Sequence, residues 1–274
     1  MTVTAVERFI GSVKPTPSSL REGEVHVWRA DSREPWPQSV LRGLLSEDER
    51  SRAWSFAFEE DRRRYIHAHG LLRILLGGYL GRPPDSIRLT TGRNGKPCLP
   101  LEDRTVRFNI SHARALVLCT LARNREVGVD VEWRDREFSW RDVAAYTCSE
   151  REQRALSSLA GPTQAETFFS WWTLKEAYVK ALGAGLELPL NRIDVVADGL
   201  EPQFVAPARD DIRDHRWAMF ALPMGAEYAG ALVTEGRPAR VRCFQWAWDS
   251  EEVRVARAET NCGEVEEHHH ARQS

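Results

Sequence analysis

Long apolar runs are missing from this sequence, and so is any large excess of charge of one sign. No stretch approaches the roughly 20 apolar residues that a membrane-spanning helix needs. The first residues, MTVTAVERFIGSVKPTPSSL, contain no apolar core, so we expect no signal peptide. The formal net charge is −2, which gives no argument for a nucleic-acid partner or for an anionic membrane.

Paired cysteines are missing as well. The five cysteines are odd in number, scattered and without C-x-x-C spacing: Cys98, Cys119, Cys148, Cys243 and Cys262. This pattern argues against a disulfide framework and against a zinc site. We therefore expect reduced thiols and a cytoplasmic protein.

What the sequence does contain is typical of a globular protein. Its 274 residues are 42% hydrophobic and 28% charged, enough for one large domain or two small ones. Two capping boxes, Ser46 with Glu49 and Ser149 with Glu152, each open a helix, and their serines lie 103 residues apart (149 − 46).

The elements around these boxes follow the same order twice. The first series has a strand at 24–28, helices at 47–55 and 61–80, and strands at 87–89, 106–110 and 116–121. The second has a strand at 128–132, helices at 150–159 and 167–182, and strands at 192–196, 217–222 and 228–233. We predict an α+β protein of two similar halves, packed as a pseudo-dimer with a ligand cleft between them. The predicted boundaries are 1–125 for the first half, 126–248 for the second with an edge strand at 241–248, and 249–274 for a polar tail.

The second long helix carries an unusual pair of charges. Residues 168–185, FFSWWTLKEAYVKALGAG, are apolar around most of the helix, which predicts burial. Glu176 and Lys180 are four residues apart and share one face. Charges on a buried helix are costly unless they are paired or used, so a structural ion pair and a functional site are both open interpretations.

A second acidic motif, Gly128-Val129-Asp130-Val131-Glu132, alternates like a strand. Asp130 and Glu132 then face the same side, roughly 6.5–7 Å apart. Two like charges side by side destabilise a sheet unless a cation lies between them. With Glu176 they form a candidate oxygen-ligand set for a divalent cation, most simply Mg²⁺.

Candidate anion-binding groups surround these carboxylates. They are the turn Arg93-Asn94-Gly95-Lys96, the stretch Ser111-His112 at the end of a strand, and Arg52, Arg62, Arg63 and Arg64 on the first-half helices. Each of them alone is best interpreted as a solvated surface group. Together with a metal site they indicate a substrate with several phosphates.

These residues resemble a known family. GVDVE and WWTLKEAYVKALGAGL, preceded by NGKPCLP and FNISHA, are similar to the motifs of the Sfp-type 4′-phosphopantetheinyl transferases, and the resemblance runs over residues 46–196. It implies a monomeric pseudo-dimer with coenzyme A in the cleft between its halves. It also implies a magnesium-dependent transfer of the 4′-phosphopantetheine arm to a serine of an apo acyl or peptidyl carrier protein, with release of 3′,5′-ADP.

The resemblance also implies a role for each motif residue. Asp130, Glu132 and Glu176 would bind magnesium against the diphosphate, and Asp130, Glu176 and Lys180 would be catalytic. Glu176 is the candidate general base, acting directly or through a metal-bound water. Asp130, Glu176 and Lys180 would also contact coenzyme A. Its other contacts would come from Arg52, Arg93, Asn94, Gly95, Lys96, Asn109, Ile110, Ser111 and His112. Carrier proteins are acidic around their serine as a class, so charge and helix position in this sequence suggest docking near 141–145 and 151–156. The carrier's pathway (fatty acid, polyketide or nonribosomal peptide) stays open.

Two other functions fit the same residues. A magnesium-dependent phosphohydrolase would use the three carboxylates with water as the nucleophile. A non-catalytic interaction protein would carry Asp130 and Glu132 as exposed strand charges and Glu176–Lys180 as a structural pair.

Overall fold

The computed structural model describes residues 6–11, 14–34, 38–135, 137–197, 202–205 and 217–247. The predicted tail, 249–274, lies outside them. The α-helices are α1 (Gln38–Leu44), α2 (Glu47–Trp54), α3 (Glu59–Leu80), α4 (Trp140–Thr147), α5 (Glu150–Ser158) and α6 (Pro162–Leu182). The strands are β1 (Glu24–Asp31), β2 (Thr90–Thr91), β3 (Pro97–Cys98), β4 (Val106–Ala113), β5 (Leu116–Arg123), β6 (Val127–Trp133), β7 (Asp194–Ala197), β8 (Pro202–Val205), β9 (Trp217–Ala221), β10 (Tyr228–Glu235) and β11 (Arg240–Gln245). No helix in the described part of the chain combines the length and apolar character needed to cross a bilayer.

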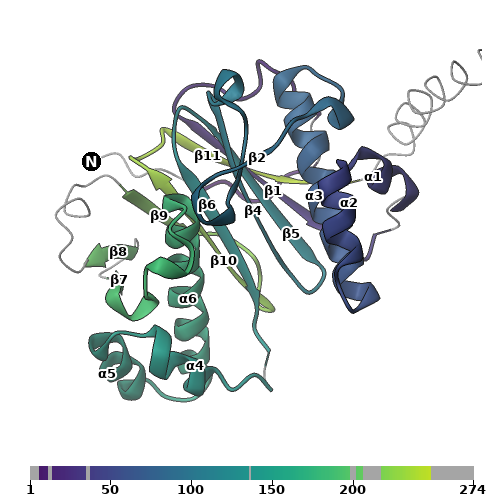
Figure 1. Ribbon diagram of the computed structural model, residues 1–274. Helices are drawn as coiled ribbons and strands as arrows, with labels where there is room; N and C mark the ends of the chain where they lie inside the picture. The colour runs from purple at the N-terminus through teal and green to yellow at the C-terminus, as the bar shows by residue number, and fades with distance from the viewer. Residues whose placement is uncertain are drawn as a thin grey trace, which may run out of the picture.

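The two halves have the same topology, which confirms the predicted fold class. In the first half, β5 lies between β1 and β4 and is antiparallel to both. In the second half, β10 lies in the same way between β6 and β9. One long helix covers each sheet, α3 in the first half and α6 in the second (Figure 1). These helices end at Gly81 and Gly183, which take left-handed φ values of 67° and 65° and lie 102 residues apart (183 − 81).

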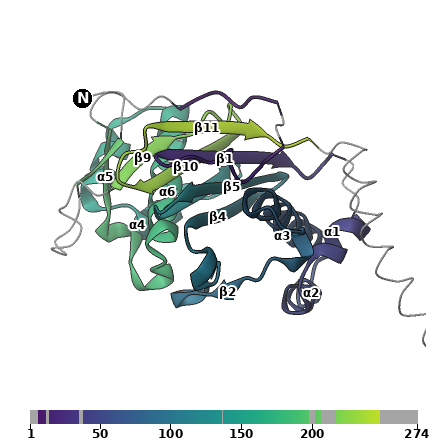
Figure 2. The same ribbon diagram turned by 90° about the horizontal axis from the view of Figure 1, so that it is seen from above.

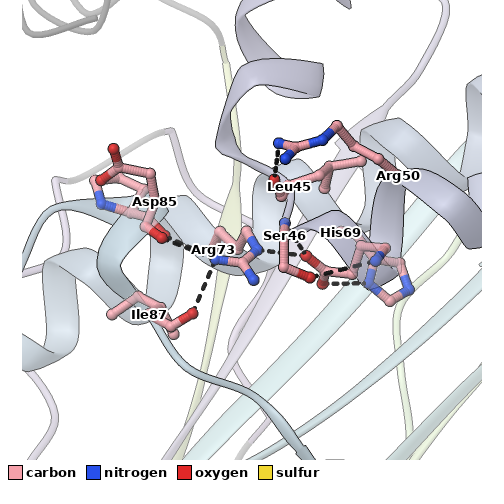
Figure 3. Close-up of polar contacts among 9 residues, drawn as sticks. Leu45, Ser46, Arg50, His69, Arg73, Asp85 and Ile87 are labelled. Atoms are coloured by element: carbon pink, nitrogen blue, oxygen red, sulfur yellow. Dashed lines mark hydrogen bonds and ion pairs between the residues drawn. The ribbon is translucent and has the colours of Figure 1, made fainter. Parts of the chain in front are cut away.

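Both predicted capping boxes are present, and each has a buried cation attached. Glu49 caps Ser46 N and accepts a hydrogen bond from Arg73 Nε at 2.6 Å. Figure 3 shows Arg73 reaching the carbonyl of Ile87 on its other side, at 2.9 Å. In the second half, Glu152 caps Ser149 N and pairs with Lys175 Nζ at 2.5 Å. Each box therefore anchors its short helix to the long helix behind it.

The halves meet where β4 runs beside β6, and we call this line of contact the seam. Asn109 Oδ1 on β4 accepts a hydrogen bond from Val129 N on β6 at 2.9 Å. Behind the seam, one buried apolar cluster contains Val27 and Leu118 from the first half and Val129 and Leu232 from the second. The view from above shows β11, β1, β5 and β4 of the first-half sheet in that order, with α3 beside β5 and β4 (Figure 2).

The structure corrects two sequence predictions. Residues 87–89 are not a strand, because a 3₁₀ turn (Pro84–Ser86) precedes them and the Ile87 carbonyl binds Arg73. Ser111 and His112 lie within β4 rather than after it, since the turn comes at Arg114, whose φ is +50°. The predicted edge strand at 241–248 is confirmed as β11, which lies at the edge of its sheet and pairs in parallel with β1. The division at residue 125 remains a prediction, and β11 crosses it.

Candidate active site

Close packing of α6 on β6 positions the acidic residues. A Cβ atom added to Gly128 would lie 2.0 Å from the carbonyl oxygen of Ala177 and 2.5 Å from the nitrogen of Ala181. Only glycine permits this approach of helix to strand. Because side chains alternate along a strand, Asp130 and Glu132 share the face of Gly128 that α6 covers.

Asp130 is at the centre of the site and connects the halves. Its side chain is buried, and its Oδ1 accepts hydrogen bonds from Ser111 Oγ at 2.9 Å and Lys180 Nζ at 2.6 Å. The Lys180 ammonium also donates to Ser111 Oγ at 2.9 Å. Lys180 therefore binds Asp130 and Ser111, and the alternative of a structural Glu176–Lys180 pair on the helix face is not what forms.

The other two carboxylates hold protons unusually tightly. Burial, and after it the negative charge of Asp130, raise the pKa of Glu132 to about 7 against the opposing effect of Lys180. Burial and Asp130 also raise the pKa of Glu176. The negative charge of Asp130 thus acts on both Glu132 and Glu176, so the three carboxylates lie near one another. Lys180 is a positive charge close to both glutamates.

The donor set fits a hard divalent cation, although it is not assembled as a metal site. Within the described residues, no group of three or more His, Cys, Asp or Glu side chains is arranged to hold a metal ion. Asp130 Oδ2 is buried and accepts no hydrogen bond from the described residues. An unpartnered buried carboxylate oxygen beside two strongly proton-binding carboxylates suits Mg²⁺, which prefers oxygen ligands.

His112 lies on β4 between the carboxylates and α3. Although this residue is exposed at the surface, desolvation of its ring lowers the pKa, and the positive charges of Lys180, Arg64 and His69 lower it further. The ring of Tyr65 stacks on His69 at 3.9 Å between centroids. This flank of the site therefore carries Arg64 and His69, which are paired with the carboxylates of Glu60, Asp61 and Glu49. Arg64 was already among the candidate anion-binding groups, whereas His69 was missed as a site neighbour, because only the packing of α3 on β4 brings it there.

Arg52 is on the same flank but farther out. It is exposed on α2, and its guanidinium lies 5.4 Å from the centre of the Phe56 ring. Its charge acts on Tyr65.

The predicted turn at 93–96 connects the halves at the other end of the seam. Asn94 takes φ +56° and its amide donates to the carbonyls of Gly183 and Ala184, at 3.1 and 2.8 Å. Lys96 Nζ donates to the carbonyl of Ala181 at 3.1 Å, and burial lowers its pKa. Gly95 has φ +82° and open space beside it, while the side chain of Arg93 lies outside the described residues.

A cleft of about 700 Å³ opens beside this turn. Its lining includes Lys96, Arg107, Phe108, Tyr178 and Trp217. The carboxylates Asp130, Glu132 and Glu176 are not among its lining residues, so the cleft and the acidic site occupy different parts of the seam.

The remaining predicted contacts, Asn109 and Ile110, lie on β4 between the two ends. Asn109 is buried and bonded to Val129 N, so its side chain joins the two strands. Ile110 packs against the first-half core.

Comparisons with known proteins match both halves. A family model described as 4′-phosphopantetheinyl transferase, N-terminal, matches residues 27–123, and the model of the 4′-phosphopantetheinyl transferase superfamily matches residues 126–233. The 4′-phosphopantetheinyl transferase HetI of Nostoc sp. is 36% identical over 192 residues, which are 69% of this chain and 81% of that protein. The chain belongs to the 4′-phosphopantetheinyl transferase superfamily.

Other members of this superfamily match over shorter stretches. The 4′-phosphopantetheinyl transferase Sfp of Bacillus subtilis is 34% identical over 164 residues, covering 55% of this chain and 71% of that protein. A solved structure of a holo-(acyl-carrier-protein) synthase from Bacillus anthracis, in complex with CoA (3′,5′-ADP), is 24% identical. It covers 40% of this chain and 96% of that one, with a TM-score of 0.35. The family models and the match to HetI confirm the predicted family membership.

Proposed function

We propose that this protein transfers the 4′-phosphopantetheine arm of coenzyme A to a serine of an apo acyl or peptidyl carrier protein and releases 3′,5′-ADP. The observation that carries the proposal is Asp130, held between Ser111 of one half and Lys180 of the other, with Glu132 and Glu176 within range of its charge. Family membership makes the phosphopantetheine transfer the reaction to which this arrangement belongs.

The three carboxylates are the proposed holders of magnesium. A magnesium ion bound by Asp130, Glu132 and Glu176 would supply positive charge against the diphosphate of coenzyme A. Asp130 Oδ2, buried and unpartnered within the described part of the chain, is the oxygen best placed to serve as a ligand.

Glu176 is the proposed general base. Its raised pKa means that its carboxylate binds a proton more tightly than an exposed glutamate does, which favours removal of the proton from the serine hydroxyl. The serine oxygen then attacks the phosphorus that bears the pantetheine arm, and the bond from this phosphorus to the oxygen of 3′,5′-ADP breaks. Lys180 stabilises the negative charge that moves to the leaving group.

The proposed coenzyme A contacts follow the seam. Lys96 and the backbone of Asn94 and Gly95 would bind the nucleotide at the end where β4 and β6 begin. Arg93 and Arg52 stay in the proposal by motif match alone. Ser111 and His112 would bind phosphate, with the positive charges that act on His112 as the support. Asn109 and Ile110 would contribute by shaping β4.

A cytoplasmic monomer is part of this proposal. The described cysteines, Cys98, Cys119, Cys148 and Cys243, are free thiols, as expected in a reducing compartment.

Intact-mass measurement tests the reaction. The protein is incubated with coenzyme A, Mg²⁺ and a panel of apo carrier proteins. We expect a mass gain of one phosphopantetheine on the carrier and an equal amount of 3′,5′-ADP. Release of phosphate or phosphopantetheine from coenzyme A without any carrier would support a phosphohydrolase instead. An inert protein would support the non-catalytic interpretation.

A single substitution tests the base. Glu176→Gln keeps the size of the side chain and removes its charge and its proton affinity. We expect transfer to fall by roughly 10²–10⁴-fold, the range that general-base catalysis contributes, with an unchanged melting temperature. Glu166→Gln, on the same helix, is the matched control and should transfer normally. Wild-type turnover in Glu176→Gln would remove Glu176 from the mechanism.

A further inference from the structure

A hollow of about 310 Å³ lies just beyond the acidic site and is rich in arginine. We call it the arginine groove and define it by Arg33, Arg63, Arg64 and Arg114, together with Trp133 and Tyr228. We propose that the arginine groove docks an acidic surface of the carrier protein, next to the serine that receives the phosphopantetheine. This inference rests on the proposed function, since that reaction needs a folded protein as acceptor.

The groove continues the strands that carry the site. Trp133 follows Glu132 on β6, and Arg114 comes two residues after His112 at the β4–β5 turn. The Arg114 guanidinium lies 4.1 Å from the centre of the Trp133 ring, so the two strands still lie side by side there. At about 3.3 Å per residue, this contact lies on the order of 10 Å along the seam from Asp130 and Ser111. A protein seated on the groove would therefore reach the site with one surface side chain.

The charge of the groove selects the partner. Four guanidinium groups line it together with two carboxylates, Glu60 and Glu227, and Arg64 is paired with Glu60 and with Asp61. Arg33 and Arg114 are exposed, and their ion pairs with Asp31 and Asp135 stay at the surface. The Arg63 side chain is exposed and makes no hydrogen bond or ion pair with any described residue. Guanidinium groups gathered in this way match carboxylates, to which each can donate two hydrogen bonds.

The direction of the reaction favours this end of the seam. In phosphoryl transfer the attacking and leaving oxygens lie roughly in line on opposite sides of the phosphorus. The proposed nucleotide turn at Gly95 and Lys96 lies where β6 begins, and Lys96 contacts Glu126 and Val127 there. The arginine groove lies where β6 ends. An acceptor that docks on the groove therefore places its serine on the side away from the leaving group.

The sequence had instead suggested docking at 141–145 and 151–156. Arg151 and Arg154 are exposed on α5, which packs against α6 and β7 rather than against the seam. These two residues give a matched pair of exposed arginines for the experiment.

The test compares Arg63→Glu/Arg114→Glu with Arg151→Glu/Arg154→Glu. The carrier is an apo acyl carrier protein with carboxylates flanking its serine, labelled with a fluorophore. Its Kd is measured by anisotropy without coenzyme A, and KM and kcat are measured by intact mass. We expect the groove variant to raise the Kd and KM for the carrier by about tenfold or more, with lower sensitivity to salt, because exposed charge pairs mainly govern association. The KM for coenzyme A and the melting temperature should stay at the wild-type values, and the α5 variant should behave like the wild type.

Three results would overturn the docking site. They are an unchanged carrier Kd and KM in the groove variant, a rise in the KM for coenzyme A alone, which would make the groove a phosphate site, or a larger loss in the α5 variant. Failure of the proposed function gives a different result. In that case the wild type binds the carrier and the groove variant binds it more weakly, but no carrier gains the mass of a phosphopantetheine.

Discussion

Lys180 divides its ammonium between the carboxylate of Asp130 and the hydroxyl of Ser111, and this arrangement links three elements at one point. Ser111 comes from β4, Asp130 from β6 and Lys180 from α6. A phosphate or metal ion entering the site must compete with these contacts or add to them. The unpartnered Asp130 Oδ2 is the atom that can bind a cation while Oδ1 keeps Lys180 and Ser111.

His26 makes folding sensitive to acid. Its Nδ1 is 2.6 Å from Tyr79 Oη, which accepts a hydrogen bond from Trp28 Nε1 and so has its own proton to donate to a neutral imidazole. Burial lowers the pKa of His26 from 6.5 to about 4. A lowered folded-state pKa in a histidine means that the unfolded chain binds more protons between pH 4 and 6.5, so stability falls as the pH drops through that window.

The expected loss from His26 is on the order of 2 kcal/mol between pH 7.5 and pH 5. Urea unfolding at the two pH values measures it. His26→Gln keeps an acceptor for Tyr79 and cannot titrate, so its pH dependence should be smaller by about that amount. His67, whose pKa burial also lowers to about 4, adds a similar dependence that the variant retains. Identical pH dependence in the wild type and His26→Gln would show that His26 does not carry this effect.

At the scale of elements, the contact between α6 and β6 decides whether the site assembles. Gly128→Ala would place a methyl group against the backbone of Ala177 and Ala181, which cannot move aside without moving the helix. We expect a loss of about 1–3 kcal/mol in the free energy of unfolding, the usual cost of overpacking. The rate of transfer should fall by more than the loss of folded protein accounts for, because displacement of α6 would move Glu176 and Lys180 away from Asp130.

Gly43→Ala is the control for Gly128→Ala. Gly43 lies in α1 with nothing within 4 Å of its added Cβ, so alanine should be neutral or slightly stabilising there. Denaturant unfolding and intact-mass transfer assays on both variants make the comparison. Normal stability and transfer in Gly128→Ala would contradict the close approach.

Local signals in the sequence predicted the elements well. The capping serines, the closing glycines and the alternation at 128–132 are each decided by a few neighbouring residues, and all are present. The prediction of a strand at 87–89 was wrong because of a tertiary contact: the Ile87 carbonyl accepts a hydrogen bond from Arg73 and is not available to a neighbouring strand. The cations attached to the capping boxes and the pairing of β11 with β1 depend on residues far apart in sequence, where no periodic pattern exists.

The site residues also fall into those that the sequence could identify and those that only the packing of the chain brings together. Asp130, Glu132, Glu176 and Lys180 could be selected from spacing and the cost of buried charge, although their roles remain a proposal. The partner of Lys180 could not be selected, since helical spacing favoured Glu176 and only the packing of β4 beside β6 offers Ser111 and Asp130. The arginine groove is likewise built from Arg33, the start of α3 and the β4–β5 turn, which no short motif connects.

At the scale of the whole molecule, the two halves share their core rather than merely touching. The cluster behind the seam combines buried residues from strands of both halves with Val241 and Cys243 of β11, which are both fully buried. Polar contacts add to this at both ends, from Asn94 to the end of α6 and from Asn109 to β6. A site built across the seam therefore depends on the halves remaining folded together.

This shared core predicts one cooperative unfolding transition. Leu118 in the first half and Leu232 in the second are both fully buried in the same cluster. Replacing either with alanine should cost about 2–5 kcal/mol, the usual range for a buried leucine. Because the cluster belongs to both halves, each substitution should shift the whole transition. In calorimetry we expect a single peak in both variants, with the calorimetric enthalpy equal to the van't Hoff enthalpy.

Leu182→Ala, a leucine that is 40% exposed, is the control and should change the melting temperature much less. Two separate peaks, of which Leu118→Ala moves one and Leu232→Ala the other, would mean that the halves fold independently and that the seam, with the site across it, is only a contact between finished domains.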